Sequence, residues 1–262
     1  MTNAEPPLLD ARGVTLRYKT AESLVTATEN VSFSVFQADR FVLLGPSGCG
    51  KSTILKSIAG FLEPAAGEFT LKGRRITEPG PDRMMVFQEF DQLLPWKTVE
   101  ENVLFPMLTT RRFRRPEAVE RARLFLDKVN LSKFRGAFPH TLSGGMKQRV
   151  AIARAMAMAP EVLLMDEPFA SLDALTRRKM QDELLELWDE LRFTVLFVTH
   201  SIEEAILLGS RILVLTPHPG RVRAELNAHT LVHEDVGTAA FRDLNRRIHT
   251  MLFGEGAVGR VA

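Results

Sequence analysis

The sequence predicts an α/β protein in which helices flank a mainly parallel sheet. The main observation is a repeated order of apolar run, polar loop and helical pattern, with the runs at 41–44, 162–165 and 194–198. Short continuous apolar runs are typical of strands that are buried on both faces, as in parallel sheets. Because strands that alternate with helices form parallel sheets, this order predicts the fold class.

The elements before residue 62 follow from their periodicity. Val14–Tyr18 and Val31–Val35 alternate between apolar and polar residues, which predicts two strands with one buried face each. The run at 41–44 predicts a buried strand that enters a glycine-rich loop. From Lys51 to Phe61 the apolar residues recur at helical spacing, as Ile54, Leu55 and Ile58.

Between Glu89 and Met158 the pattern changes to helix. Three helices are predicted there, at Val99–Leu108, Glu117–Val129 and Gly144–Met158. We therefore predict a single domain over 8–253, in which a helical subdomain (89–158) is inserted into an α/β core (8–88 and 159–225).

The pattern after residue 214 is weaker. A turn is predicted at Pro217–Gly220, because proline and glycine together favour turns. A surface helix is predicted at Ala240–Leu252, within a C-terminal extension at 226–262.

Composition limits the possible partners and compartments. The chain has 34 basic and 32 acidic residues and a net charge of +2, so we expect no nucleic-acid partner. A single cysteine, Cys49, excludes an internal disulfide and fits a reducing compartment. We find no secretory signal and no apolar run of about 18 residues. We therefore expect a soluble chain that can still dock on a membrane protein.

The glycine-rich loop has the residues that a triphosphate requires. Its glycines let successive backbone N–H groups point inward, and the helix that follows adds a positive N-terminal partial charge. A lysine reaches the outer phosphates, and a serine hydroxyl can ligate Mg²⁺. The predicted nucleotide-binding residues of this phosphate loop are Gly45, Pro46, Ser47, Gly48, Cys49, Gly50, Lys51, Ser52 and Thr53.

Two carboxylates follow the apolar run at 162–165. Asp166 stands where a carboxylate can hold Mg²⁺ through water, and Glu167 can orient or deprotonate an attacking water. An acidic pair at a strand end is common, so this motif alone is weak evidence for a nucleotide site. It becomes strong evidence because it follows a second glycine motif, which is described next.

That second motif is the signature segment, Leu142–Met146. Ser143, Gly144 and Gly145 open a helix, so a hydroxyl, bare backbone N–H groups and a helix N-terminus form another anion site. The serine can equally serve as a helix cap. With the phosphate loop before it and Asp166-Glu167 after it, the chain resembles an ATP-binding cassette ATPase over about residues 8–221.

The resemblance implies a fold and a set of roles. The fold is a P-loop NTPase core with an N-terminal antiparallel β part and the helical subdomain as an insertion. His200 corresponds to the switch histidine at the γ-phosphate and acts with Glu167 in catalysis. Tyr18 stacks on adenine, and Asp173 belongs to the loop that crosses the subunit interface. Magnesium is ligated by Ser52, Gln88 and Asp166, and Gln88 also links the two lobes.

The resemblance also implies partners. In this family two subunits face each other head to tail, and each ATP lies between the phosphate loop of one and the signature segment of the other. Met146 stands where the family usually has glutamine. Segments such as Phe87-Gln88-Glu89 and Pro217–Arg221 are similar to importer ATPases for nitrate, taurine and aliphatic sulfonates. The implied complex is a homodimer with two membrane-spanning permease subunits and, indirectly, a periplasmic solute-binding protein. It lies at the cytoplasmic face of the bacterial inner membrane.

Two alternatives stay open from the sequence. A soluble cassette ATPase of the repair or assembly type, without a transport role, is the main rival. The segment Leu93–Trp96 either docks on a partner or packs inside the helical subdomain.

Overall fold

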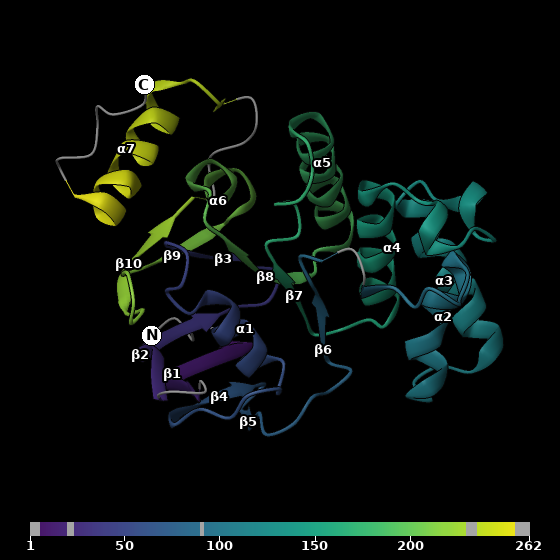
Figure 1. Cartoon of the computed structure of the whole chain (residues 1–262), viewed down its shortest axis with the longest axis horizontal. Helices are drawn as coiled ribbons and strands as arrows, with labels where there is room; N and C mark the ends of the chain where they lie inside the picture. The colour runs from purple at the N-terminus through teal and green to yellow at the C-terminus, as the bar shows by residue number, and fades with distance from the viewer. Residues whose placement is uncertain (1–5, 20–23, 90–91, 229–234, 255–262) are drawn as a thin grey trace. The chain divides into compact units, whose positions relative to one another are not determined.

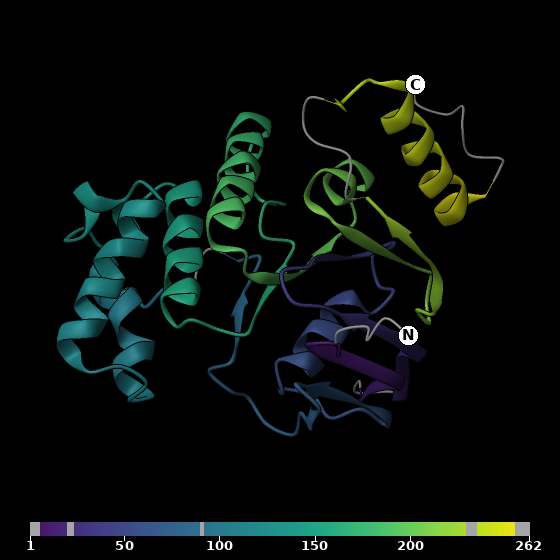
Figure 2. The same ribbon diagram turned by 180° about the vertical axis from the view of Figure 1, so that it is seen from behind.

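The computed structural model describes residues 6–19, 24–89, 92–228 and 235–254. Figures 1 and 2 show the ribbon of the whole chain. Its internal contacts divide the chain into two units. The first unit is Met1–Pro79 with Thr194–Ala262, and the second is Gly80–Phe193. The second unit contains the helical subdomain predicted at 89–158 and extends beyond it on both sides. The boundaries at 88 and 159 stay a prediction.

The first unit contains an antiparallel sheet with the strand order β2-β1-β4-β5. Leu9 of β1 pairs with Val35 of β2 and with Leu71 of β4, so β1 lies between the two. The strands are β1 (Leu9–Lys19), β2 (Leu24–Val35), β4 (Ala66–Leu71) and β5 (Arg74–Arg75). Phe33 of β2 stacks on Phe41 of β3 (Arg40–Leu44), with ring centroids 5.2 Å apart, which joins this sheet to the parallel strands.

The first unit also holds parallel strands in the order β10-β9-β3-β8. Leu44, the last residue of β3, pairs with Thr199 of β8 and Val214 of β9. The C-terminal ends of these strands therefore meet at one edge, where the phosphate loop and His200 begin. The strands are β3 (Arg40–Leu44), β8 (Thr194–Thr199), β9 (Arg211–Leu215) and β10 (Val222–Asn227), of which β10 is antiparallel to β9.

The described residues of the first unit form three α-helices: α1 (Lys51–Ile58), α6 (Ile202–Leu208) and α7 (Ala239–Phe253). The predicted helix at 240–252 is confirmed as α7, which buries Phe241, Ile248 and Leu252 on one face. Its contacts are with α6 and β9, and Figure 1 shows it beside them.

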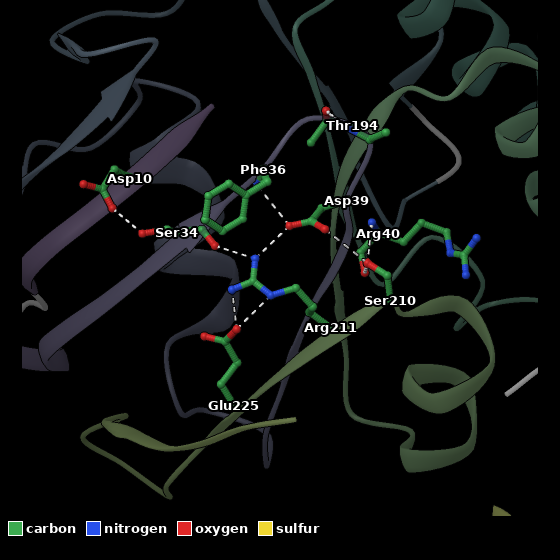
Figure 3. Close-up of polar contacts among 10 residues, drawn as sticks. Asp10, Ser34, Phe36, Asp39, Arg40, Thr194, Ser210, Arg211 and Glu225 are labelled. Carbon is green, nitrogen blue, oxygen red and sulfur yellow. Dashed lines mark hydrogen bonds and ion pairs between the residues drawn. The ribbon is translucent and has the colours of Figure 1, made fainter. Parts of the chain in front are cut away.

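A polar network fixes the N-terminal ends of the parallel strands. Arg211 donates to Asp39 (2.8 Å) and to the Ser34 carbonyl (2.9 Å), and it pairs with Glu225 on β10. Figure 3 shows its guanidinium between the two carboxylates. Asp39 also accepts from the N–H of Phe36 at 2.9 Å. One side chain thus joins β2, β10 and the start of β3, at the end of β3 opposite the phosphate loop.

The second unit combines two parallel strands with helices. Strand β6 (Arg83–Val86) pairs with β7 (Val162–Asp166), and Val86 lies opposite Met165. Helices α2, α3 and α4 contact one another, and α4 also packs on β6. The bounds are α2 (Val99–Thr109), α3 (Arg115–Lys128), α4 (Gly144–Ala157) and α5 (Ala174–Leu191), with short 3-10 helices η2 (Ser132–Phe134) and η3 (Pro139–Thr141).

Side-chain caps explain where several of these helices begin. Thr98 and Glu101 form a reciprocal capping box at α2, in which each side chain bonds the other residue's backbone N–H. Ser143 and Asp173 cap α4 and α5 by accepting from an N–H three residues later. In the described part of the chain, no helix is both long enough and apolar enough to cross a lipid bilayer.

Candidate functional site

The phosphate loop joins β3 to α1 in the first unit. Gly48 and Gly50 have φ angles of +79° and +93°, a region that side chains disfavour. A Cβ on Gly50 would lie 2.8 Å from the Ala27 carbonyl oxygen, so close packing on β2 also requires glycine there. Gly50 is the N-cap of α1 and makes no side-chain cap bond. The helix N-terminus is thus left for an anion, which fits a triphosphate.

The side chain of Lys51 folds back against the phosphate loop. It is buried, and Nζ donates to the carbonyls of Gly45 (2.8 Å) and Pro46 (3.0 Å). These bonds hold the ammonium at the loop. Ser52 and Thr53 follow in the first turn of α1 and are partly exposed.

His200 directly follows β8, and a hydroxyl network holds the residues around it. Thr199 donates its hydroxyl to the buried carboxylate of Glu204. The Ser201 N–H donates back to Thr199 Oγ1 at 3.0 Å, and Ser201 Oγ accepts from the Glu204 N–H at 3.3 Å. The imidazole itself is exposed. Sequence reasoning assigned no role to Thr199, although it directly precedes the predicted histidine.

Tyr18 is near the end of β1, where it pairs with Val25 of β2. Its side chain is 43% exposed, which leaves ring surface available for stacking. The proposed adenine contact remains a prediction.

Gln88 follows β6 in the second unit and is exposed. The segment around it is tied to α4. Gln92 brackets Phe87, accepting from its N–H (3.2 Å) and donating to its carbonyl (2.9 Å). Gln148 of α4, fully buried, donates to the same carbonyl at 3.4 Å. Arg154 of α4 donates to the Gln92 carbonyl at 2.7 Å.

Burial lowers the pKa of Arg154, because removing water disfavours its charged form. These contacts join Phe87 and Gln92, on either side of Gln88, to the helix that begins with the signature segment. Sequence patterns did not identify Gln92, Gln148 or Arg154, because their partners lie up to 62 residues away.

The signature segment lies at the start of α4. Ser143 Oγ accepts from the Met146 N–H at 3.3 Å, so the cap reading of this serine is confirmed. Gly145 is packed so closely that a Cβ would lie 2.9 Å from Thr176 Cγ2 of α5. Ser143 is exposed and Gly144 partly so, which leaves this helix end accessible.

Asp166 ends β7, and Glu167 follows it with a φ of +44°. Such a conformation is uncommon for a residue with a side chain and clusters at functional sites. Sequence reasoning could not foresee it. Arg177 of α5 spans the loop that follows, donating to the carbonyls of Phe169 (3.2 Å) and Leu172 (2.9 Å).

Asp173 caps α5 by accepting from the Thr176 N–H at 3.0 Å. Hydrogen bonds from the Thr176 side chain and backbone lower the pKa of this carboxyl. The residue keeps its charge at neutral pH, which suits the proposed position at an interface.

The predicted magnesium ligands suit a mostly hydrated ion. Ser52, Gln88 and Asp166 include one carboxylate, and the described residues contain no cluster of three or more His, Cys, Asp or Glu side chains that could hold a metal. Magnesium commonly keeps several waters and takes one or two carboxylates together with substrate phosphates. The donor set therefore fits an ion that arrives with a nucleotide.

Comparisons with known proteins identify the family of this chain. Residues 28–170 match the family model described as ABC transporter. A taurine import ATP-binding protein from Rhizobium johnstonii is 52% identical over 206 residues, which cover 78% of this chain and 77% of that protein. A nitrate import ATP-binding protein from Synechococcus elongatus is 43% identical over 80% of this chain and 76% of its own length.

A solved structure is also similar. The dimeric post-hydrolysis structure of the ATP-binding cassette MJ0796 bound to ADP and Pi is 32% identical and has a TM-score of 0.72. The match covers 85% of this chain and all of that one. With these similarities and the phosphate loop described above, the chain belongs to the ABC transporter family, as one of its ATP-binding, ATP-hydrolysing cassettes.

Proposed function

We propose that this chain is the ATPase subunit of an importer for a small anion, such as nitrate, taurine or an aliphatic sulfonate. The supporting observation is the 52% identity to a taurine import ATP-binding protein over most of both chains. The nitrate import relative supports the same class of solute. Both of these relatives are import proteins, which favours transport over a repair or assembly role.

The proposed catalytic roles use residues of both units. Lys51 exchanges the carbonyls of Gly45 and Pro46 for outer phosphate oxygens. Glu167 orients a water and accepts its proton as the water oxygen bonds to the γ-phosphorus, while the bond to the bridging oxygen breaks. His200 contacts the γ-phosphate. Magnesium, held by Ser52, Gln88 and Asp166, would neutralise charge on the phosphates.

The complete ATP site needs a second copy of the chain. The signature segment offers an accessible hydroxyl and a helix N-terminus, while the phosphate loop already supplies both features in the first unit. One triphosphate has no use for two such cradles from one chain. A head-to-tail homodimer places them on opposite sides of each nucleotide, with Asp173 at the interface. The dimeric state of the similar solved cassette supports this arrangement.

Exposed aromatic residues of the second unit support docking to permease subunits. Trp96 is 71% exposed, whereas Leu93, three residues earlier, is buried. Within Leu93–Trp96, Leu93 thus packs inside the second unit, whereas Trp96 is available to dock on a partner. Phe105 of α2 is also exposed, with Lys97 over its ring. Two permeases docked here would place the chain at the cytoplasmic face of the inner membrane, served indirectly by a solute-binding protein.

The test compares wild-type chain with Glu167→Gln in the source organism. We expect the tagged chain in the membrane fraction, together with two membrane-spanning subunits in equal amounts. Uptake of one radiolabelled anion among nitrate, taurine and an alkanesulfonate should fall to background with Glu167→Gln, at unchanged protein level. A chain found only in the supernatant, with uptake of all three anions unaffected, would contradict the importer role.

A further inference from the structure

The turn between β9 and β10 is attached to β2. Gly220 donates its N–H to the Ala27 carbonyl and accepts from the Glu29 N–H, both at 2.9 Å, so that Thr28 and Gly220 form a parallel bridge. Arg221 pairs with the Glu29 carboxylate at 2.6 Å. All of these residues lie in the first unit. The C-terminal end of the turn, at Gly220 and Arg221, is therefore held against β2.

Thr216 closes the turn from the other side. Its N–H donates to the Arg221 carbonyl at 2.9 Å, and its hydroxyl oxygen accepts from the Arg221 N–H at 3.0 Å. The same hydroxyl donates to the Pro219 carbonyl at 3.3 Å. These bonds fix the position of Gly220 within the turn.

Gly220 lies directly on the phosphate loop. A Cβ at this residue would be 2.1 Å from the carbonyl oxygen of Cys49 and 3.2 Å from its carbonyl carbon. Real Cβ atoms do not approach backbone so closely, so no side chain fits at 220 unless the loop moves. At the other end of the loop, a Cβ on Gly45 would be 3.2 Å from Leu215 Cβ of β9. Strand β9 and its turn thus contact both ends of the phosphate loop.

The two distances also give the direction of the Cys49 carbonyl. The carbonyl carbon is 1.1 Å farther from the Cβ position than its oxygen is (3.2 − 2.1 Å). Because this is most of the length of a C=O bond, about 1.23 Å, the bond points toward Gly220. In a planar trans peptide the N–H of the next residue points the opposite way. The Gly50 N–H therefore faces away from the turn. Within the described residues, no group accepts a hydrogen bond from it.

We propose that Gly220 is a positioning residue for the phosphate loop. Its missing side chain lets the turn support the Cys49 carbonyl, which aims the Gly50 N–H at the nucleotide phosphates. An added methyl group would push or rotate this peptide and misdirect a donor that phosphate binding uses. The inference rests on the proposed role of residues 45–52 as the phosphate loop.

The test is the affinity of the purified full chain for ATP, measured by calorimetry on Gly220→Ala. Gly136→Ala is the matched control, because a Cβ at Gly136 meets nothing within 4 Å. We expect the ATP dissociation constant to rise about tenfold or more in Gly220→Ala, equivalent to about 1.4 kcal/mol. The control should bind like wild type. Unchanged affinity in a folded Gly220→Ala chain would overturn the proposal.

A second readout separates positioning from general loss of structure. In a chain labelled with ¹⁵N-glycine, the Gly50 amide resonance should move when ATP is added. At saturating ATP this movement should be smaller in Gly220→Ala than in Gly136→Ala. An equal movement in both would contradict the proposed aiming of this N–H.

Two further variants make every outcome informative. If Gly220→Ala does not fold, Thr216→Val removes both hydroxyl bonds of the turn without adding an atom at 220. It should raise the ATP dissociation constant about threefold, and an unchanged constant would overturn the proposal. Lys51→Ala tests the loop itself: if it also binds ATP normally, the assignment of the phosphate loop fails. If only Lys51→Ala weakens binding, the inference on Gly220 fails alone.

Discussion

At the scale of single residues, the backbone around His200 is held by hydroxyl bonds. Thr199 uses one oxygen both as donor to Glu204 and as acceptor from the Ser201 N–H. His200 lies between Thr199 and Ser201, so these bonds fix the backbone on both sides of it, while its imidazole stays exposed. A change at Thr199 should therefore act on catalysis through His200.

Thr199→Val keeps the shape of the side chain and removes both bonds. We expect ATP hydrolysis to fall about tenfold to a hundredfold, because small misplacements of a catalytic group have effects of that size. The ATP dissociation constant should change less than about threefold, since the phosphate loop is intact. Steady-state kinetics and calorimetry check the two values.

Thr194→Val is the matched control at the other end of the same strand. Thr194 is also buried and also accepts from a backbone N–H, that of Ala38 at 3.0 Å. Both variants leave one N–H without its acceptor. Equal loss of hydrolysis in both would show that the effect is a general weakening of β8.

At the scale of elements, Arg211 joins strands that are distant in sequence. It bonds Asp39 and the Ser34 carbonyl and pairs with Glu225, as Figure 3 shows. Its side chain is 18% exposed and that of Asp39 is 10% exposed. The charges are thus largely removed from water, where loss of one partner leaves the other poorly compensated.

Arg211→Met should lower the free energy of unfolding by about 2–3 kcal/mol, below the full cost for a completely buried pair because some solvent remains. Urea denaturation measures the change. Arg12→Met is the control, since Arg12 is 67% exposed and its partner Asp10 keeps a hydrogen bond from the Ser34 hydroxyl when Arg12 is removed. That variant should lose less than about 1 kcal/mol. Similar losses in both would contradict a structural role for the Arg211 network.

Elements with strong local signals were predictable from the sequence. The apolar runs became β3, β7 and β8, and the helical spacing in the helical subdomain became α2, α3 and α4. β10 was missed although Val222, Ala224 and Leu226 alternate with polar residues; most of its residues are exposed, and its position depends on pairing with β9. β4 was missed as well, since only its second half is buried.

In the candidate site, too, some features were predictable from the sequence and others were not. The phosphate loop, Asp166-Glu167 and the signature segment are contiguous motifs, so their residue types and order were visible. Gly220 and Cys49 are in contact but lie far apart along the chain. The positive φ of Glu167 is likewise a property of the folded backbone. Periodicity and composition carry no signal for such features.

At the scale of the whole molecule, the proposed site residues fall into two groups. Lys51 and His200 belong to the first unit, and Glu167 and the signature segment belong to the second. The central claim is that the signature segment of one copy acts on the nucleotide held by another copy. Glu167→Gln should make this visible, because it leaves binding intact and blocks hydrolysis, so that ATP produces a lasting dimer.

The most direct measurement mixes two defective chains, both in the Glu167→Gln background. One carries Lys51→Ala and an affinity tag, and the other carries Gly144→Asp, which places a carboxylate at the proposed phosphate contact. Their heterodimer contains one site with both parts intact, whereas neither chain alone can form one. We predict that ATP makes the tagged chain retain the untagged one, although neither variant associates with itself. If the mixture shows no ATP-dependent retention while Glu167→Gln alone dimerises, the shared site is contradicted.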